Sequence, residues 1–141
     1  MNLNIVDVTL RDGGYRNNFN FKEKTIIETI SSLNHSKIDF IEIGYRGGSF
    51  KKDLFTGNTA HLPDDFLSRI TSFIPNKTCV MVHPSNITKD DVKILHAAGV
   101  KMVRVCVSHQ VMQEAIQLID ELKSFGFLVT ANIIRITLIP E

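Results

Sequence analysis

An arginine and an aspartate stand side by side early in the chain, in the run Asp7-Val8-Thr9-Leu10-Arg11-Asp12-Gly13. They directly follow a short β-branched segment that we expect to be the first strand. In a (β/α) barrel the carboxyl ends of the strands form the catalytic face. Gly13 and Gly14 would let the backbone turn there and leave room for a substrate. Arg11 and Asp12 are therefore a candidate catalytic pair, with a structural ion pair in a loop as the alternative interpretation.

The first loop lacks the signature of a nucleotide-binding fold. Its two glycines have no third glycine at the spacing of a dinucleotide fingerprint, and no Gly-Lys-Ser/Thr ending of a phosphate-binding loop occurs in the chain. Other polar residues also follow or lie within expected strands. His83 and His109 follow strands, and Arg104 lies inside one, where it either faces a substrate or is a buried structural ion. The run Tyr45-Arg46-Gly47-Gly48 either lines an anionic substrate or begins a glycine-rich loop.

Strand and helix patterns alternate along the whole chain. We expect strands over residues 5–10, 38–43, 78–82, 100–107 and 127–134, and helices over residues 21–34, 63–73, 88–99 and 110–125. Asn20 with Glu23, and Thr88 with Asp91, have the spacing of helix capping boxes. The nearly continuous apolar character of the last three strands is typical of a sheet that is covered on both faces.

This alternation predicts an α/β fold with a parallel sheet. The expected strands begin about every 31 residues, so eight units would need about 250 residues, the usual length of a TIM (β/α)8 barrel. We therefore expect a partial barrel of about five parallel strands with intervening helices, in sequential order and with a curved sheet. The alternative is a complete flavodoxin-like domain that binds a small ligand, with strand order 2-1-3-4-5.

Composition excludes several classes of partner. The 141 residues include 16 Lys+Arg against 15 Asp+Glu, which gives no electrostatic reason to expect nucleic acid. No apolar run approaches the ~20 residues that span a bilayer, and no signal peptide is visible, so we expect a cytoplasmic protein without a membrane partner. Cys79 and Cys106 are too few for a disulfide scaffold, and we expect two buried thiols.

The run from Asp7 to Gly13 resembles the signature opening of the DRE-TIM metallolyases, the HMGL-like aldolases and lyases. This family includes 4-hydroxy-2-oxovalerate aldolase, which this chain most resembles, hydroxymethylglutaryl-CoA lyase and the pyruvate carboxylase transferase domain. The run Phe40-Ile41-Glu42-Ile43-Gly44-Tyr45-Arg46 is similar to the second strand of the family. The resemblance implies that residues 1–141 are the N-terminal portion of such a barrel domain.

The resemblance also implies a chemistry. Asp12 matches the ligand of a divalent metal, Mg²⁺ or Mn²⁺, and Arg11 matches the residue that stabilises an enolate oxygen. Glu42 matches the acid that positions this arginine, so we expect an ion pair between them and expect Arg11 and Asp12 to face one cavity. The implied reaction is cleavage or formation of a C–C bond next to a carbonyl, in a 4-hydroxy-2-oxoacid or acyl-CoA substrate. We expect Tyr45, His83 and Arg104 to contact that substrate.

Two departures from the family pattern qualify this expectation. The family completes its metal site with a His-x-His pair, whereas none of the five histidines here has that spacing: His35, His61, His83, His96 and His109. The aldolases also have a histidine base three residues after the metal aspartate, where this chain has Tyr15. We therefore expect this segment alone to bind no metal and to be inactive, with Tyr15 orienting the substrate or donating a proton.

A second class of function is a non-catalytic half-barrel that assembles with itself or with another chain. Five strands leave open sheet edges, which favour pairing with another copy. The C-terminal stretch is also markedly apolar, with Ile133, Ile134, Ile136, Leu138 and Ile139. We therefore expect self-association or marginal stability.

Overall fold

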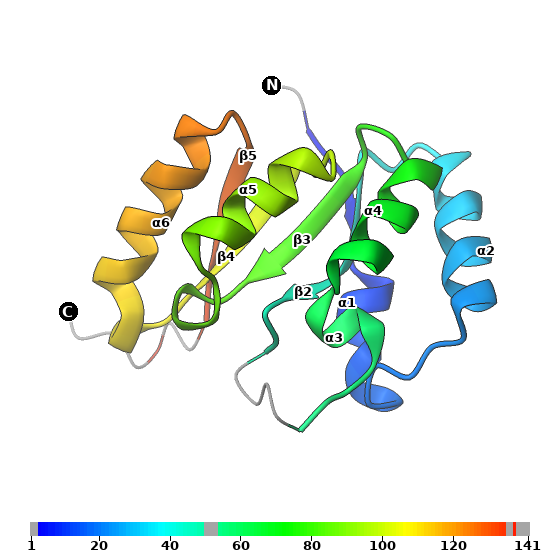
Figure 1. Ribbon diagram of the computed structural model, residues 1–141, viewed down its shortest axis with the longest axis horizontal. Coiled ribbons are helices and arrows are strands. Elements are labelled where there is room, and N and C mark those ends of the chain that lie inside the picture. The colour runs from blue at the N-terminus through cyan, green and yellow to red at the C-terminus, as the bar shows by residue number, and fades with distance from the viewer. Residues whose placement is uncertain (1–2, 50–53, 135–136, 138–141) are drawn as a thin grey trace.

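Five parallel strands form one sheet in sequential order in the computed structural model, which describes residues 3–49, 54–134 and 137 (Figure 1). The strands are β1 (Val6–Asp7), β2 (Phe40–Arg46), β3 (Thr78–Val82), β4 (Met102–Val107) and β5 (Leu128–Ile133). The order β1-β2-β3-β4-β5 confirms the partial barrel and shows that the flavodoxin-like alternative is wrong.

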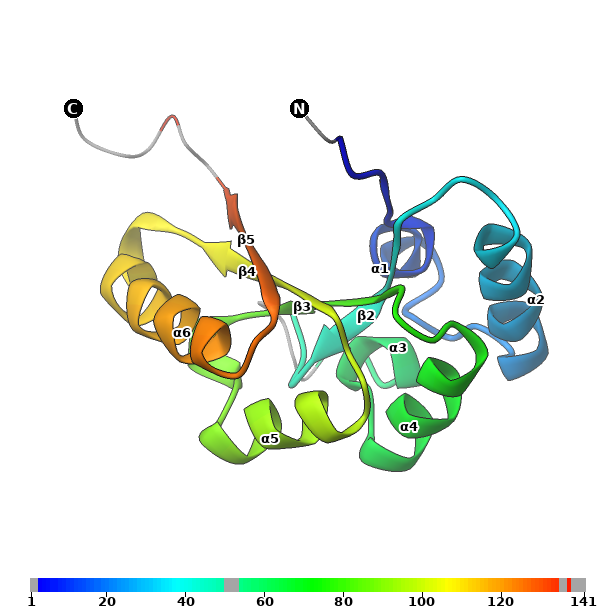
Figure 2. The same ribbon diagram turned by 90° about the horizontal axis from the view of Figure 1, so that it is seen from above.

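The long helices cover one side of this curved sheet. Viewed from above, they follow one another along its outer side, while the inner side carries no such layer (Figure 2). They are α2 (Glu23–Asn34), α4 (Asp64–Phe73), α5 (Lys89–Ala97) and α6 (Met112–Ser124). The short helices are α1 (Thr9–Gly13), α3 (Asn58–His61), η1 (Gly14–Arg16), η2 (Pro84–Asn86) and η3 (His109–Val111). Among the described residues, no helix is both long and apolar enough to cross a membrane.

The main apolar core lies between the sheet and the long helices. Strand side chains alternate between the two faces, so every second residue points to this core. The strands contribute Ile41, Ile43, Val80, Val82, Val103 and Val105, and the helices contribute Ile26, Ile30, Phe66, Leu67, Ile70, Val92, Leu95 and Leu122. Each such side chain stabilises the fold by about 1.5–3 kcal/mol on burial.

Strand β3 is buried on both of its faces, whereas strand β5 is not. All five residues of β3 are buried, whereas Leu128 and Ile133 in β5 are 42% and 51% exposed. The expectation that β5 is covered on both faces is therefore wrong for the described residues, among which β5 is the edge strand of the sheet. Ile134 packs partly on the inner face, whereas Ile136, Leu138 and Ile139 lie outside the described residues.

The first strand is much shorter than expected, because the chain turns into a helix at Thr9. The Asp7 carboxylate accepts hydrogen bonds from the Thr9 amide and hydroxyl, both at 3.0 Å. The Asp12 amide then donates to the Val8 carbonyl at 2.8 Å, which closes the first helical turn. Arg11 and Asp12 therefore stand on α1, and not in a loop.

The two predicted helix caps have different outcomes. At α5 the capping box is confirmed, since the Thr88 hydroxyl and the Asp91 carboxylate each accept a hydrogen bond from the other residue's amide. At α2 the predicted cap is wrong. Residues 18 and 19 adopt left-handed backbone conformations, so Asn20 ends a turn and α2 begins three residues later, at Glu23.

A β-bulge in β2 places two important side chains on the same face. Glu42 pairs with Cys79, and Tyr45 pairs with Met81. Between these pairs, β2 has two residues, Ile43 and Gly44, whereas β3 has only Val80. In a regular strand, residues three apart point to opposite faces. The extra residue therefore turns Tyr45 to the inner face, where Glu42 also points.

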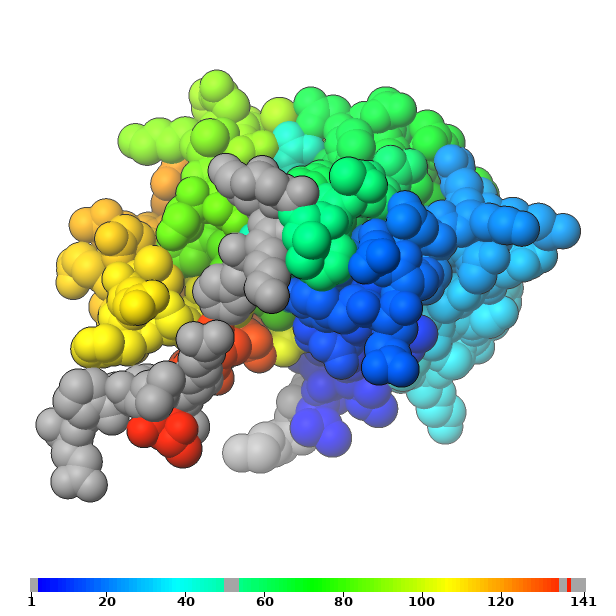
Figure 3. All heavy atoms as spheres, turned by 90° about the horizontal axis from the view of Figure 1, so that it is seen from below, coloured from blue at the N-terminus to red at the C-terminus, as the bar shows by residue number. Residues whose placement is uncertain are grey.

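Gly44 lies in this bulge and allows α3 to approach the sheet closely. A Cβ atom at Gly44 would stand 2.0 Å from the carbonyl oxygen of Thr59, which lies in α3. This contact supports a second, smaller cluster on the inner face, which contains Phe19, Tyr45, Phe55, Ala60, Met81 and Cys106. The space-filling view shows the N-terminal residues in blue packed against the blue-green segment that contains α3 (Figure 3).

Replacing Gly44 by alanine should therefore destabilise the protein. A methyl group there must displace the α3 backbone, and overpacking of this kind costs about 1–3 kcal/mol. The measurement is the free energy of unfolding in urea, followed by circular dichroism. Gly13→Ala is the matched control, because no atom lies within 4 Å of its Cβ position and its φ is −63°. Equal stability of Gly44→Ala and the wild type would contradict the close approach of α3.

Candidate functional site

A buried carboxylate at the centre of the inner face joins two arginines. The Glu42 side chain has no exposed surface. Its Oε1 accepts a hydrogen bond from Arg11 Nε at 2.5 Å, and its Oε2 accepts one from Arg104 Nη1 at 2.9 Å. The predicted ion pair between Arg11 and Glu42 is confirmed, and Arg104 proves to be a second partner of the same carboxylate.

Arg11 reaches this site from α1. Its side chain is 13% exposed, whereas that of Asp12 is 67% exposed, and Arg11 Nη1 donates to Asp12 Oδ1 at 2.8 Å. Burial disfavours the charged guanidinium, but the hydrogen bond and charge of Glu42 outweigh it, so the pKa of Arg11 is raised. Arg11 is thus mostly buried and Asp12 well exposed, with their side chains bonded to each other, and the expectation that both face one cavity stays a prediction.

Arg104 extends the network across the sheet to β5. Its Nη2 donates to Asn132 Oδ1 at 3.1 Å. Sequence reasoning missed Asn132, although a single amide in the apolar run 127–134 was a signal of an inward-facing polar group. The predicted burial of both thiols is confirmed, with Cys79 at 0% and Cys106 at 4% exposure. Burial and the neighbouring Glu42 charge raise the pKa of the Cys79 thiol, which keeps it protonated.

The charges of this network favour an anionic ligand. Two guanidiniums, Arg11 and Arg104, share one buried carboxylate, Glu42, so the buried part of the network has one more positive charge than negative. Asp12 is well exposed, so water screens its charge. A guanidinium has five N–H donors, so the bonds described above leave donors for the oxygen atoms of a substrate.

Aromatic side chains border the arginines. The Tyr15 and Tyr45 hydroxyl oxygens are 2.9 Å apart, and the Arg11 guanidinium carbon lies 6.0 Å from the centre of the Tyr45 ring. The Tyr45 ring stacks on the His83 imidazole, with centroids 5.7 Å apart and an interplanar angle of 20°. Burial lowers the pKa of His83 to about 4, so this imidazole is neutral at physiological pH.

Arg46 has a structural role, in contrast to Arg11 and Arg104. It donates to the Leu62 carbonyl at 2.6 Å and forms ion pairs with Asp64 at 2.6 Å and Asp91 at 2.7 Å. These contacts join β2 to α4 and α5. The interpretation of the Tyr45–Gly48 run as an anion site therefore does not extend to Arg46. His109 is exposed in η3, away from these contacts.

The described residues do not by themselves form a metal site. No group of three His, Cys, Asp or Glu side chains among them is arranged to hold a metal ion. Asp12 has the exposed carboxylate that a metal could use, but its Oδ1 accepts a hydrogen bond from Arg11. The assignment of Asp12 as a metal ligand stays a prediction from the family resemblance.

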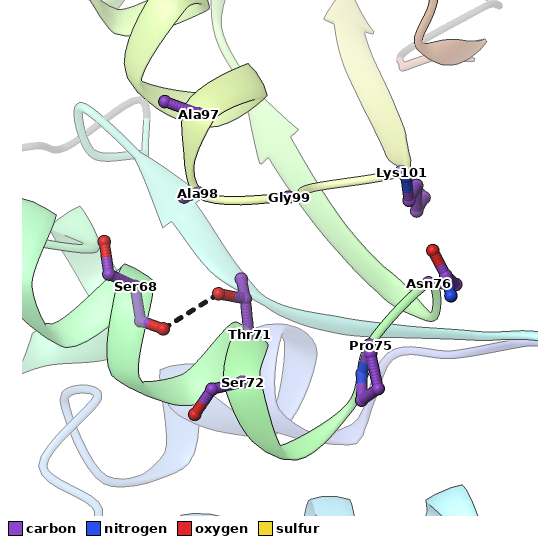
Figure 4. Close-up of a pocket in the computed structure, with 9 residues that line it drawn as sticks. All are labelled: Ser68, Thr71, Ser72, Pro75, Asn76, Ala97, Ala98, Gly99 and Lys101. Atoms are coloured by element: carbon purple, nitrogen blue, oxygen red, sulfur yellow. Dashed lines mark hydrogen bonds between the residues drawn. The ribbon is translucent and has the colours of Figure 1, made fainter.

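A pocket of about 340 Å³ lies elsewhere, at the end of the sheet where β3 and β4 begin (Figure 4). Small polar residues from the end of α4 line one side, and Gly99 and Lys101 line the other. In barrel enzymes this amino-terminal face serves stability, whereas the carboxyl-terminal face carries the chemistry. Arg11 and His83 both follow the carboxyl ends of strands, so this pocket is separate from the arginine site.

Comparison with known proteins finds aldolases. No family model matches the chain. The chain is 27% identical over 138 residues to a 4-hydroxy-2-oxovalerate aldolase of Carboxydothermus hydrogenoformans, covering 94% of this chain and 41% of that protein. It is 26% identical to the Shewanella pealeana aldolase of the same name, covering 91% and 39% respectively. It is 21% identical to an oxaloacetate decarboxylase of Mycobacterium tuberculosis, covering 93% and 39%.

A solved structure supports the same comparison. The N-terminal domain of a candidate aldolase from Bacteroides vulgatus superposes with a TM-score of 0.80 at 30% identity, covering 96% of this chain and 46% of that chain. The chain thus spans about two fifths of the length of the curated relatives that it matches. The resemblance to the aldolases is confirmed, and the matched portion fits an N-terminal part.

Replacing Glu42 by glutamine should strongly destabilise the fold. The neutral amide leaves two mostly buried guanidiniums without their shared negative charge, and loss of one partner of a buried ion pair costs about 3–5 kcal/mol. The measurement is the free energy of unfolding in urea. Glu23→Gln is the control, since its pair with Arg69 is about half exposed and screened by water. Similar small losses in both variants would contradict the central role of Glu42.

Proposed function

We propose that this chain is the N-terminal part of an aldolase barrel that cleaves a C–C bond of a 4-hydroxy-2-oxoacid through an enolate. The observation that carries the proposal is Arg11, which α1 places at the carboxyl end of the sheet and the buried Glu42 carboxylate orients. A charged, oriented guanidinium at that position is suited to stabilise a developing enolate oxygen.

The names of the relatives favour a 2-oxoacid over an acyl-CoA. Both 4-hydroxy-2-oxovalerate and oxaloacetate are 2-oxoacids, and cleavage of the C3–C4 bond in either leaves the enolate of pyruvate. Such a substrate carries a carboxylate, which suits the excess positive charge beside Glu42. Arg104 is 19% exposed and is the second guanidinium of the network, so we assign it to the substrate carboxylate.

The proposed reaction requires stabilisation of an enolate and transfer of one proton. The proton of the C4 hydroxyl leaves, the C3–C4 electron pair moves to the enolate, and the C4 carbonyl forms as the aldehyde departs. Arg11 stabilises the enolate oxygen with its N–H donors. Tyr15 exchanges the hydroxyl proton, since its own hydroxyl stands in the aromatic border of the site and the residue is 42% exposed. Tyr45 and His83, which are 5% and 4% exposed, form the buried part of the same border.

Dependence on Mg²⁺ or Mn²⁺ stays a prediction from the family resemblance. Asp12 is the residue that would bind the ion, and the described residues offer no complete set of ligands around it. If bound, the ion would polarise the carbonyl and hydroxyl oxygens of the substrate, beside the roles assigned to Arg11, Arg104 and Tyr15. We expect the isolated chain neither to bind the metal nor to cleave the substrate.

A chimera tests this proposal directly. The chain replaces the segment that it matches in the Carboxydothermus aldolase, and pyruvate release from 4-hydroxy-2-oxovalerate is measured with Mn²⁺ present. We expect turnover by the chimera, a loss of about 10²–10³-fold in Arg11→Ala, and no metal binding in Asp12→Ala. Arg69→Ala, on the outer surface, is the control. A folded chimera without turnover, or full metal affinity in Asp12→Ala, would contradict the proposal.

The second candidate is a non-catalytic half-barrel that assembles with itself. The observation in its favour is β5, where Leu128 and Ile133 are exposed next to an open strand edge. Such edges pair readily with other chains. Light scattering on the isolated chain should therefore show a concentration-dependent mass above that of the monomer, reduced in Ile133→Lys. A monodisperse monomer that melts cooperatively at high temperature would contradict self-association.

A further inference from the structure

The hydroxyl groups of Tyr15 and Tyr45 lie within hydrogen-bonding distance, but the two residues differ in their exposure to water. Their oxygens are 2.9 Å apart. Tyr45 is 5% exposed, whereas Tyr15 is 42% exposed. A charged phenolate is disfavoured wherever water cannot reach it, so the buried member of the pair retains its proton.

Burial favours one direction for this hydrogen bond. The buried Tyr45 hydroxyl has the Tyr15 oxygen within reach, whereas the exposed Tyr15 hydroxyl can also bond to solvent, so we assign Tyr45 as the donor. Burial and the Tyr15 contact also raise the pKa of Tyr45, which keeps it protonated. The Tyr15 oxygen is then the acceptor, and the Tyr15 proton remains available to a molecule that enters from solvent. Arg11 favours negative charge here, because its guanidinium lies 6.0 Å from the Tyr45 ring centre.

The surrounding side chains fix both rings. Tyr15 packs edge-on against Phe19 and Phe55, with centroid distances of 5.1 and 5.5 Å. Tyr45 packs edge-on against Phe19 and stacks on His83. These aromatic contacts hold the two hydroxyls together from elements that are far apart in sequence, η1 and β2.

Few titratable groups face the pair among the described residues. Arg11 faces it from α1 and is permanently charged. His83 faces it after β3 and is neutral, since burial lowers its pKa to about 4. Cys106 from β4 belongs to the same cluster, and burial raises the pKa of its thiol. Between pH 6 and pH 8 (roughly the physiological range), the pair therefore keeps a constant electrostatic environment.

We propose that Tyr15 and Tyr45 act as one proton-transfer unit, in which Tyr45 donates a hydrogen bond to Tyr15 and Tyr15 exchanges the proton with the substrate. Tyr15 is the catalytic residue, and Tyr45 is its positioning residue. The identity of the substrate rests on the proposed function, whereas the coupling of the two hydroxyls does not.

One proton passes through Tyr15 in each direction of the reaction. In cleavage, the Tyr15 phenolate takes the proton of the C4 hydroxyl, the C3–C4 bond breaks, and its electron pair forms the enolate. Tyr15 is then neutral and returns its proton to solvent, and the enolate carbon takes a proton from solvent. In the reverse direction, neutral Tyr15 donates its proton to the new C4 oxygen, and Tyr45 stabilises the resulting phenolate. Cleavage by this unit should become faster as pH rises.

The composition of the chain allows the pair to be observed without any assay of activity. Tyr15 and Tyr45 are its two tyrosines, and it has no tryptophan. Tyrosinate absorbance near 295 nm therefore reports this pair alone. Selective ¹³Cζ-tyrosine labelling gives one resonance for each hydroxyl-bearing carbon.

The first experiment compares the wild type with Tyr15→Phe and Tyr45→Phe, each of which removes one hydroxyl and keeps the ring. At pH 7, each variant should shift the ¹³Cζ resonance of the remaining tyrosine, because its hydrogen-bond partner is gone. While far-UV circular dichroism remains native, tyrosinate absorbance in Tyr15→Phe should rise only at strongly alkaline pH, because burial raises the pKa of the remaining Tyr45. Unchanged resonances in both variants would overturn the coupling.

The second experiment uses the chimera that tests the proposed function. Tyr45→Phe should lower kcat for cleavage about tenfold, the loss of one charge-assisted hydrogen bond, with KM nearly unchanged. It should also move the alkaline rise of kcat to higher pH. Phe55→Leu, which changes packing beside Tyr15 but keeps both hydroxyls, should preserve the shape of the pH profile. The same change of profile in Phe55→Leu would assign Tyr45 a purely structural role.

The two experiments separate the two proposals. Coupled resonances in the isolated chain together with an inactive, folded chimera would support the tyrosine pair and contradict the aldolase function. An active chimera whose pH profile is unaffected by Tyr45→Phe would support the aldolase function and overturn the proton-transfer role of the pair.

Discussion

The inner face of the sheet depends on one fully buried carboxylate, that of Glu42. Glu42 lies in β2, and its two oxygens bind arginines that come from α1 and β4. Burial of an isolated carboxylate would be very costly, and two guanidiniums with direct hydrogen bonds offset that cost. In return, Glu42 fixes the position of α1 against the sheet, and through Arg104 and Asn132 it connects β2 to the edge strand β5. The candidate site is thus also the polar junction of the sheet.

The bulge in β2 extends this junction into a site with two kinds of side chain. It places Tyr45 on the same face as Glu42, and Gly44 lets α3 pack close behind. The aromatic cluster and the charged network consequently adjoin, with Arg11 in contact with both. A permanent positive charge beside a pair of hydroxyls is the combination that an enolate reaction needs, because one group stabilises an oxyanion while the other moves a proton.

Local sequence patterns predicted the parts of this structure that depend on near neighbours or on strand order. Alternation of strands and helices predicted the parallel sheet, and Thr88 with Asp91 predicted a real capping box. The approach of Arg11 to Glu42 followed from the adjacency of the first two strands. The bulge could not be predicted, because it depends on the register against β3 and on a contact of Gly44 with α3. The short β1 was missed because the Asp7 side chain competes with the strand for the Thr9 amide, a choice that β-propensity does not measure.

The two faces of the sheet divide stability and chemistry between them. The outer face packs uninterrupted apolar side chains against four long helices, and this burial supplies most of the driving force for folding. The inner face contains charged and hydroxyl groups that would be replaced by apolar residues if stability alone mattered, since well-packed apolar side chains often stabilise a core as much as a buried ion pair. The edge strand β5 joins both faces, because Val129 packs partly against the outer core while Asn132 bonds to Arg104 on the inner face. The free energy gained by apolar burial in the outer core therefore offsets the cost of burying charged groups on the inner face, where we propose that an anion binds and a proton is transferred.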